Sequence, residues 1–589
     1  MSSEDQDKHL PSLAPGPRGP CTGRPSPCKA CQNNESECIF DETLDLRRKV
    51  AARRTHGEME YYRSLLYSLV ESLRSADEAR IQHILDTIRD SSSLNPIAIA
   101  IDAPALDVGD ATFESLKEKK IEEEASPPQE RLSVDSQSRI TLEKLCDNPL
   151  FRVPATPWTI ITDDDHLVSH LISLYFTWDH PLQQVVDQKT FLSHMAIEDT
   201  DTDFCSPLLV NSILAVASES YSDFPEVFAV PGDAASRGQH FYAEAERLWK
   251  AEEGRVSLTN IQAVCLMSYV LNLHGKGRAS WMMLKQAVQL AQDWGMFQSP
   301  RARHHEWDKM PTEMQYVGAT TAWGIFMLNS QMSMEFRSVP TTPLPRFNPF
   351  TEAKLHDDIM WAPYPISNSI EYCQKPALLR YVMAAMTSLT EIVIEIEDLV
   401  FDKAFYINID GLWMAARSLY SRLEKWLELL PDVLKRDDEQ MPQTLFLHVR
   451  FHHTIISLFD FPLSHESANS ESHPSPYRQG RLTQLRSARH IAHYLRLHRE
   501  SYGLRQISGL MLEPTNISAL ILVTALDHDE TKNAFVEVCR SLVAFSKRLP
   551  EVKDMIRNVE STARLSGINL PPDAVAVLGH KELKSSQWL

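Results

Sequence analysis

Apolar residues recur at the spacing of amphipathic helices from about residue 165 to about residue 570. In "ASWMMLKQAVQLAQDWG", for example, they place Trp281, Leu284, Val288 and Trp294 on one stripe, and Gly295 marks the end of the helix. Runs in which apolar and polar residues alternate are short and few, so no sheet is expected. The chain is therefore predicted to be mostly α, with a large all-helical body that is α-solenoid-like or irregular.

Capping residues suggest where individual helices begin and end. Thr162 or Asp163 is the expected N-cap of the first helix of the body. Ser257 is expected to cap "LTNIQAVCLMSYVLNLHG", with Gly275 beyond its end. The following "HGKGR" lacks the spacing of a phosphate-binding loop and is predicted to be a turn between two helices.

Four of the nine cysteines fall within a short N-terminal segment. Two of them are separated by two residues, which allows both thiolates to reach one Zn²⁺ ion, and the other two are close enough to complete a four-sulfur shell. The other cysteines are scattered singly, which indicates a reducing compartment and not a disulfide framework. We therefore expect one zinc site, with the ligands Cys21, Cys28, Cys31 and Cys38.

The formal net charge of −20 argues against a nucleic-acid-coating surface along the whole chain. One local segment, "LRRKVAARR", is strongly basic and contains no acidic residue. It suits contacts with DNA phosphates, although a solvated helix face or a nuclear import signal fits it equally well. The expected phosphate contacts are Arg47, Arg48, Lys49, Arg53 and Arg54.

The next segment carries a seam of apolar residues with the spacing of a coiled coil, which predicts dimerisation. Its members are Met59, Tyr62, Leu66, Leu69 and Leu73. A helical hairpin within one chain is the alternative, because Ser75 and Glu78 have the spacing of a capping box that starts a second helix.

Composition divides the chain into successive parts. The segment from 92 to 160 is charged and lacks the apolar area needed to order itself, so a disordered acidic linker is expected there. No apolar run is long enough for a membrane span. The expected parts are a disordered N-terminus (1–20), a partial metal module (21–40), a basic linker with a short coiled coil or hairpin (41–91), the acidic linker (92–160), the helical domain (161–575) and a tail (576–589).

The cysteine segment resembles the second half of the Zn2Cys6 binuclear cluster of fungal zinc-cluster transcription factors. Its four cysteines match the third to sixth cysteines of that pattern, whereas Pro11 and Ala14 stand where the first two are expected. "PGPRGP" replaces the basic helix that enters the major groove in that family, and its prolines exclude a helix. Either direct DNA reading is lost or the gene product has an alternative start, and we favour the alternative start.

The helical body resembles the fungal-specific transcription factor domain from about 165 to 350, and more weakly to 570. The resemblance rests on "LYFTWDHPLQQVVDQKTF", "GKGRASWMMLKQAVQLAQDWGMF" and "TTAWGIFMLNSQMSMEFRSVP", although Asn329 stands where aspartate is commoner. It implies a nuclear regulator of RNA polymerase II transcription that binds DNA, with CGG-type half-sites for a complete cluster. It also implies a homodimer or a heterodimer with a related factor, and transcriptional coregulators as partners.

The sequence leaves two other functions open to consideration. One is a helical adaptor or corepressor derived from the same family that reads no DNA itself. The other is an all-α enzyme, which no catalytic constellation supports. "RHHEWDKM", with His304, His305 and Glu306, lacks the second histidine of a zinc-protease helix, and "HVRFHHT", with His448, His452 and His453, lacks a partner carboxylate at metal-ligand spacing.

Overall fold

The computed structural model describes most of the chain after residue 148, and the described residues all belong to one compact unit, residues 129–589. The described ranges are 149–222, 224–230, 233–298, 307–336, 338, 342–350, 359–365, 374–435, 441–465 and 474–579.

The body is built from helices, as the periodicity predicts. The first group of α-helices comprises α6 (Asp165–Trp178), α7 (Gln188–Met195), α8 (Pro207–Tyr221), α9 (Gln239–Ala251), α10 (Leu258–Leu273), α11 (Gly277–Trp294) and α13 (Thr312–Glu335). The second group comprises α14 (Leu379–Phe401), α15 (Ile409–Leu429), α16 (Asp432–Lys435), α17 (Pro442–His465), α18 (Pro474–Tyr502), α19 (Leu512–Leu522), α20 (Asp529–Ser546), α21 (Val552–Leu565) and α22 (Pro572–Gly579). Short 3₁₀ turns are η1 (Pro225–Val227), η2 (Ala234–Ser236), η3 (Lys403–Phe405), η4 (Gly509–Met511) and η5 (Val523–Ala525).

Among the described residues, one small strand pair interrupts the helical body, which the sequence did not predict. β1 (Met360–Trp361) pairs antiparallel with β2 (Lys375–Pro376). Each strand has two residues, which is too short for an alternating pattern to be visible in the sequence.

The predicted helix ends are confirmed at three positions. The Ser257 side chain accepts a hydrogen bond from the Asn260 N–H at the start of α10. Gly275 and Gly295 follow α10 and α11 with φ of 68° and 93°, a left-handed conformation that only glycine adopts without strain. "HGKGR" is indeed the turn between these two helices.

The predicted cap of the first helix is wrong by one or two residues. Asp164, and not Thr162 or Asp163, is the N-cap of α6, because its side chain accepts hydrogen bonds from the N–H groups of His166 and Leu167. The packed body also extends beyond the expected boundary at 161. Trp158 is fully buried and donates its indole N–H to the carbonyl of Met195 at 3.0 Å.

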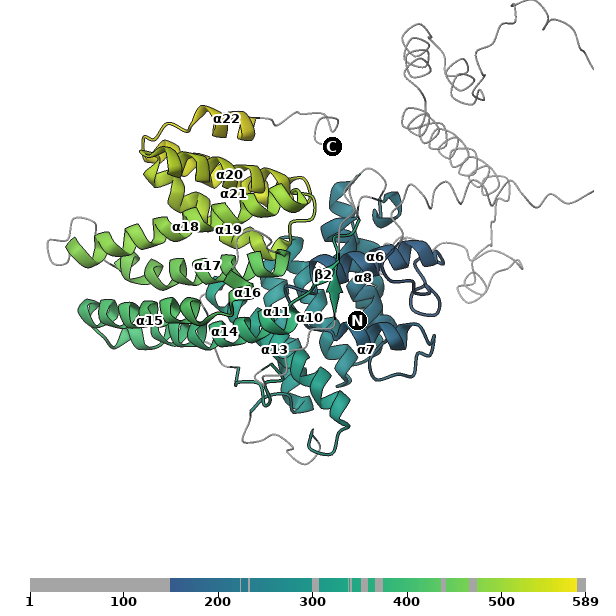
Figure 1. Cartoon of the computed structure of the whole chain (residues 1–589). Helices are drawn as coiled ribbons and strands as arrows, with labels where there is room; N and C mark the ends of the chain where they lie inside the picture. Colours follow the sequence, from purple (N-terminus) through teal and green to yellow (C-terminus); the bar gives the residue numbers. More distant parts are fainter. Residues whose placement is uncertain are drawn as a thin grey trace, which may run out of the picture. The chain divides into compact units, whose positions relative to one another are not determined.

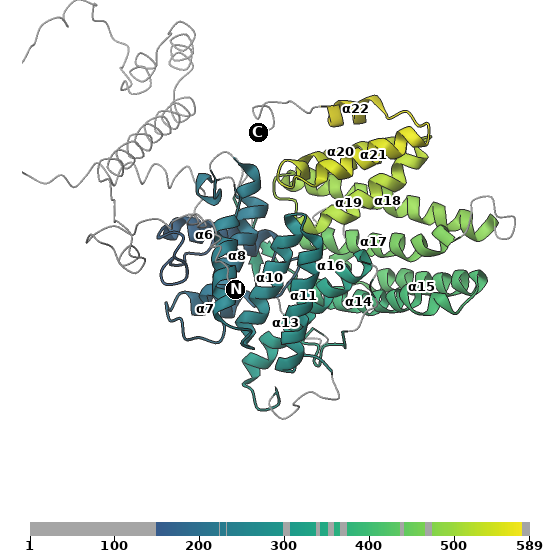
Figure 2. The ribbon, with the colours of Figure 1, turned by 180° about the vertical axis from the view of Figure 1, so that it is seen from behind.

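Helices that follow one another in sequence pack against one another through much of the body. The series α13, α14, α15 and α17 continues into α18, α19 and α20, and Figures 1 and 2 show α15, α17 and α18 side by side in both views. The arrangement is irregular and not an open solenoid, because the end of α6 meets the end of α18. There the rings of Trp178 and Tyr502 lie 5.9 Å apart.

The stripe that was predicted to be core lies against the core. Leu284 and Val288 are buried, and the two tryptophans of the stripe, Trp281 and Trp294, are partly buried against the same apolar cluster. Cys205, Cys265 and Cys539 are buried free thiols, as expected of singly scattered cysteines. Within the described ranges no helix is long and apolar enough to cross a membrane.

Candidate functional site

The residues that the sequence singled out for metal binding, phosphate contacts and dimerisation all precede residue 149, outside the described part of the chain. The zinc site, the basic cluster and the coiled coil therefore remain predictions. His304, His305 and Glu306 also lie outside the described residues.

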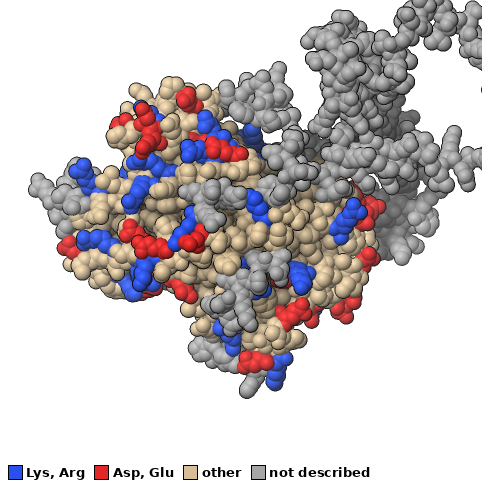
Figure 3. Space-filling model, viewed as in Figure 1, with Lys and Arg blue, Asp and Glu red and all other residues tan. Residues whose placement is uncertain are grey.

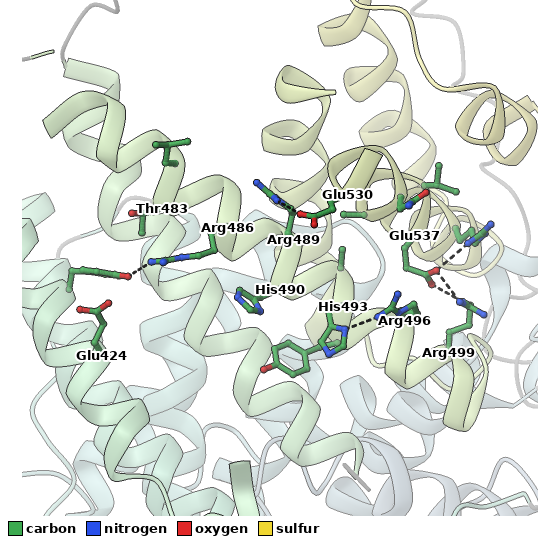
Figure 4. Close-up of a pocket in the computed structure, with 18 of the residues that line it drawn as sticks. Glu424, Thr483, Arg486, Arg489, His490, His493, Arg496, Arg499, Glu530 and Glu537 are labelled. Atoms are coloured by element: carbon green, nitrogen blue, oxygen red, sulfur yellow. Dashed lines mark hydrogen bonds and ion pairs between the residues drawn. The ribbon is translucent and has the colours of Figure 1, made fainter. Parts of the chain in front are cut away.

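The structure instead contains a groove that the sequence analysis did not find. It lies between α15, α18, α20 and α22 and has a volume of about 1380 Å³ (Figure 4). Its lining along α18 runs from Gln479 to Arg499, which corresponds to about 30 Å at the rise of an α-helix. We call it the arginine groove, after the arginines that line it: Arg417, Arg486, Arg489, Arg496, Arg499 and Arg540.

The composition of α18 accounts for the basic lining. This helix carries six arginines and one acidic residue, Glu500, in a chain whose net charge is −20. The arginines of α18 are Arg478, Arg481, Arg486, Arg489, Arg496 and Arg499. In the space-filling view, basic and acidic side chains alternate over α15, α18 and α20 (Figure 3).

Three arginines of the groove are neutralised by ion pairs. Arg499 donates two hydrogen bonds to the buried carboxylate of Glu537, at 2.7 and 3.1 Å, and Arg540 donates a third at 3.2 Å. The bonds to Glu537 raise the pKa of Arg499 above its ordinary value. Arg489 pairs with Glu530 at 2.9 Å, and the Glu530 side chain is 84% exposed.

Three arginines of the groove contact no carboxylate among the described residues. Arg417 donates to the backbone carbonyl of Trp413 at 3.3 Å. Arg486 donates to the phenol oxygen of Tyr420 at 2.5 Å, and Arg496 donates to Nδ1 of His493 at 3.0 Å. None of these acceptors is a carboxylate: they are a backbone carbonyl, a phenol oxygen and an imidazole nitrogen. Burial raises the pKa of Tyr420, and a hydrogen bond with Glu424 raises it further. Three exposed arginines along the groove thus make no direct ion pair with a described carboxylate.

Histidines form part of the base of the groove. His490, which lines it, stacks on His452 of α17 with ring centroids 4.5 Å apart. Burial lowers the pKa of His452 well below its ordinary value, so its ring is neutral. His448 is buried as well, with Nε2 2.7 Å from the carbonyl oxygen of Leu434. The "HVRFHHT" histidines therefore pack within the body, and in the described part of the chain no cluster of His, Cys, Asp or Glu side chains could hold a metal ion.

Part of this body is similar to a known protein family. Residues 172–410 match the family model of the fungal specific transcription factor domain. The match agrees with the resemblance expected from 165 to 350, extends it to 410, and does not reach 570. The arginine groove is lined by residues from Arg417 onward, so it lies beyond the matched domain.

Several fungal regulators are similar to nearly the whole chain. The notoamide biosynthesis transcriptional activator of Aspergillus versicolor is 29% identical over 94% of this chain and 89% of its own length. The nitrogen assimilation transcription factor of Neurospora crassa is 25% identical over 96% of this chain, which spans 55% of that protein. The nitrogen assimilation transcription factor of Emericella nidulans is 23% identical over 96% of this chain and 67% of its own length. No solved structure matches the chain.

Proposed function

We propose that the chain is a nuclear regulator of RNA polymerase II transcription of the fungal zinc-cluster class. The observation that carries the proposal is the match of residues 172–410 to the fungal specific transcription factor domain, within a chain that is similar over almost all of its length to named fungal transcription factors. The cysteine segment and the basic cluster that precede the helical body in the sequence support the same class.

In this proposal the N-terminal part contacts DNA and the helical body regulates activity through other proteins. The four clustered cysteines hold one Zn²⁺, and the basic cluster from Arg47 to Arg54 contacts phosphates. The apolar seam from Met59 to Leu73 pairs two chains, in a homodimer or in a heterodimer with a related factor.

A second candidate is a helical adaptor or corepressor that reads no DNA itself. The observation that favours it is the absence of the first two cysteines of the cluster, with Pro11 and Ala14 in their places, and of the basic helix between them and Cys21. Such an adaptor reaches promoters only through a DNA-binding partner.

Promoter occupancy and transcript levels, measured together, test the proposal. The full chain is tagged at its C-terminus in its own fungal cells, and its genomic occupancy is compared with the transcripts that change when the gene is deleted. We expect occupancy at the promoters of affected genes, and its loss in a chain with Cys28→Ser and Cys31→Ser. Occupancy that survives these changes but needs a second factor would support the adaptor. If deletion alters no transcripts, both functions are excluded.

A further inference from the structure

We propose that the arginine groove is the docking site for an acidic amphipathic helix of a partner protein. The proposal goes beyond the DNA-binding function above and does not depend on it, because every residue that carries it lies in the described helical body.

The size of the groove selects a macromolecular segment over a small ligand. Its volume of about 1380 Å³ exceeds the roughly 300–1,000 Å³ of small-molecule sites. Its length of about 30 Å along α18 equals that of a helix of about twenty residues. A groove of this length between helices suits a helix laid along it.

The charges of the groove select an acidic partner. Arg417, Arg486 and Arg496 are exposed and make no direct ion pair with a described carboxylate. A guanidinium binds a carboxylate through two parallel hydrogen bonds, which gives such a pair both strength and orientation. Arg486 and Arg496 are separated by about 15 Å along α18, so one partner helix reaches both with carboxylates about three turns apart.

An exposed apolar residue beside the arginines indicates that the partner helix also carries apolar side chains. Leu482 lines the groove and is 57% exposed, although it is a large apolar side chain. It lies four residues before Arg486, so the two side chains are neighbours on one face of α18. A partner that covers this face offers an apolar side chain for Leu482 and a carboxylate for Arg486, one turn apart.

Acidic residues in the walls favour a peptide over a nucleic acid. Glu424, Glu530 and Asp573 are exposed in the lining, and each would repel the evenly spaced phosphates of a DNA or RNA strand. A peptide avoids this repulsion, because it can place a lysine or an uncharged side chain opposite each of them. Figure 4 shows Glu424 and Glu530 beside the arginines, so the groove has the mixed charge of a protein-binding site.

Peptide binding to the full chain tests the proposal. The probe is a fluorescein-labelled helical peptide of about eighteen residues, with Leu and Glu on one face, and binding is followed by fluorescence anisotropy. We expect saturable binding that Arg486→Glu weakens by about tenfold or more. The matched control is Arg478→Glu, an equal change of charge at an exposed position of α18 outside the groove, which should leave affinity unchanged. In a set of peptides that each carry one Glu→Lys change, one should recover affinity for the Arg486→Glu chain, which also shows that this variant is folded.

Five results would overturn the proposal. Non-saturable binding, or an equal loss in both variants, would mean that the peptide binds only through long-range attraction. If no lysine-containing peptide recovers affinity for the Arg486→Glu chain, Arg486 does not contact the partner helix. A single-stranded DNA that binds more tightly than the peptide, with the same dependence on Arg486, would make the groove a nucleic-acid site. Self-association that Arg486→Glu abolishes would assign the groove to a second copy of the chain.

Discussion

Asp179 accepts a hydrogen bond from Ser508, a residue 329 positions further along the chain, with the two oxygens 3.3 Å apart. The same carboxylate oxygen accepts a second hydrogen bond, from Tyr269 at 3.2 Å. Asp179 directly follows α6, Tyr269 lies on α10, and Ser508 precedes η4 and α19. One buried carboxylate therefore joins the first helices of the body to its C-terminal group.

Removal of this carboxylate should destabilise the whole helical body. Asp179→Ala leaves two buried hydroxyl groups without their acceptor, and we expect a loss of about 2–4 kcal/mol in the free energy of unfolding. Chemical denaturation of the full chain, followed by circular dichroism, measures it. The control Ser561→Ala changes an exposed hydroxyl on α21 and should stay within about 0.5 kcal/mol of the unchanged chain. An equally small effect of Asp179→Ala would show that the hydrogen bonds of Asp179 do not stabilise the helical body.

Glu397 should make the stability of the body depend on pH. It is fully buried on α14 and accepts a hydrogen bond from Ser330 at 2.6 Å, and burial raises its pKa to about 7. Arg450 and Lys285, on α17 and α11, favour the charged form, but the cost of burial is larger. The folded state holds the proton of Glu397 more tightly than the unfolded chain does. The stability that this proton contributes is therefore fully present below pH 4.5 and is lost as the pH rises through 7.

Between pH 6 and pH 8 the contribution of Glu397 should fall by about 1 kcal/mol. Unfolding of the full chain and of Glu397→Gln at both pH values measures it. The amide does not ionise, so Glu397→Gln should lose less stability over this interval and should be the more stable protein at pH 8. Glu513, whose pKa burial also raises to about 7, keeps part of the dependence in both proteins. Identical pH dependence in the two proteins would show that Glu397 stays ionised in the fold.

Local signals explain which parts of this structure were predictable. Ser257, Gly275 and Gly295 determine helix ends through contacts with their own neighbours, and these ends were found. In "TDDD" several adjacent residues are equally good N-caps, and only the structure shows that Asp164 makes the bonds. The choice depends on where α6 packs, which neighbouring residues do not encode.

The arginine groove was missed for a different reason. Its lining comes from helices that are far apart in the sequence, from Arg417 on α15 to Asp573 on α22. No local pattern shows which helices will face each other. One signal was present, because six arginines with a single acidic residue in α18 stand out in a chain of net charge −20. A count of the net charge of each predicted helix would have singled out the segment that forms α18.

The full chain should bind about one zinc ion, through Cys21, Cys28, Cys31 and Cys38. Four thiolates complete one tetrahedral shell, and the two cysteines needed for a second ion are absent. Metal analysis of the protein purified under reducing conditions measures the ratio, with Cys28→Ser plus Cys31→Ser as the control that should lose the ion. A ratio of two, or no zinc at neutral pH, would contradict this prediction.

DNA binding by this chain should be weak and without sequence preference. Its basic cluster offers about five phosphate contacts, which correspond to a salt slope near −4 to −5 and a dissociation constant on the order of 10⁻⁴ to 10⁻⁶ M. Titration against a duplex with two CGG triplets and against a scrambled duplex, over a salt series, measures both quantities. A preference of about a hundredfold for the CGG duplex would show that the partial cluster reads bases.

Transcription from a tethered reporter tests the central claim, that this chain regulates transcription, most directly. The full chain is fused to a bacterial repressor DNA-binding domain and placed upstream of a reporter gene in fungal cells, so that its own DNA binding is not needed. We expect reporter transcription to change relative to the DNA-binding domain alone. A fusion that is present in the nucleus at the same level, occupies the tethering site and leaves transcription unchanged would contradict it.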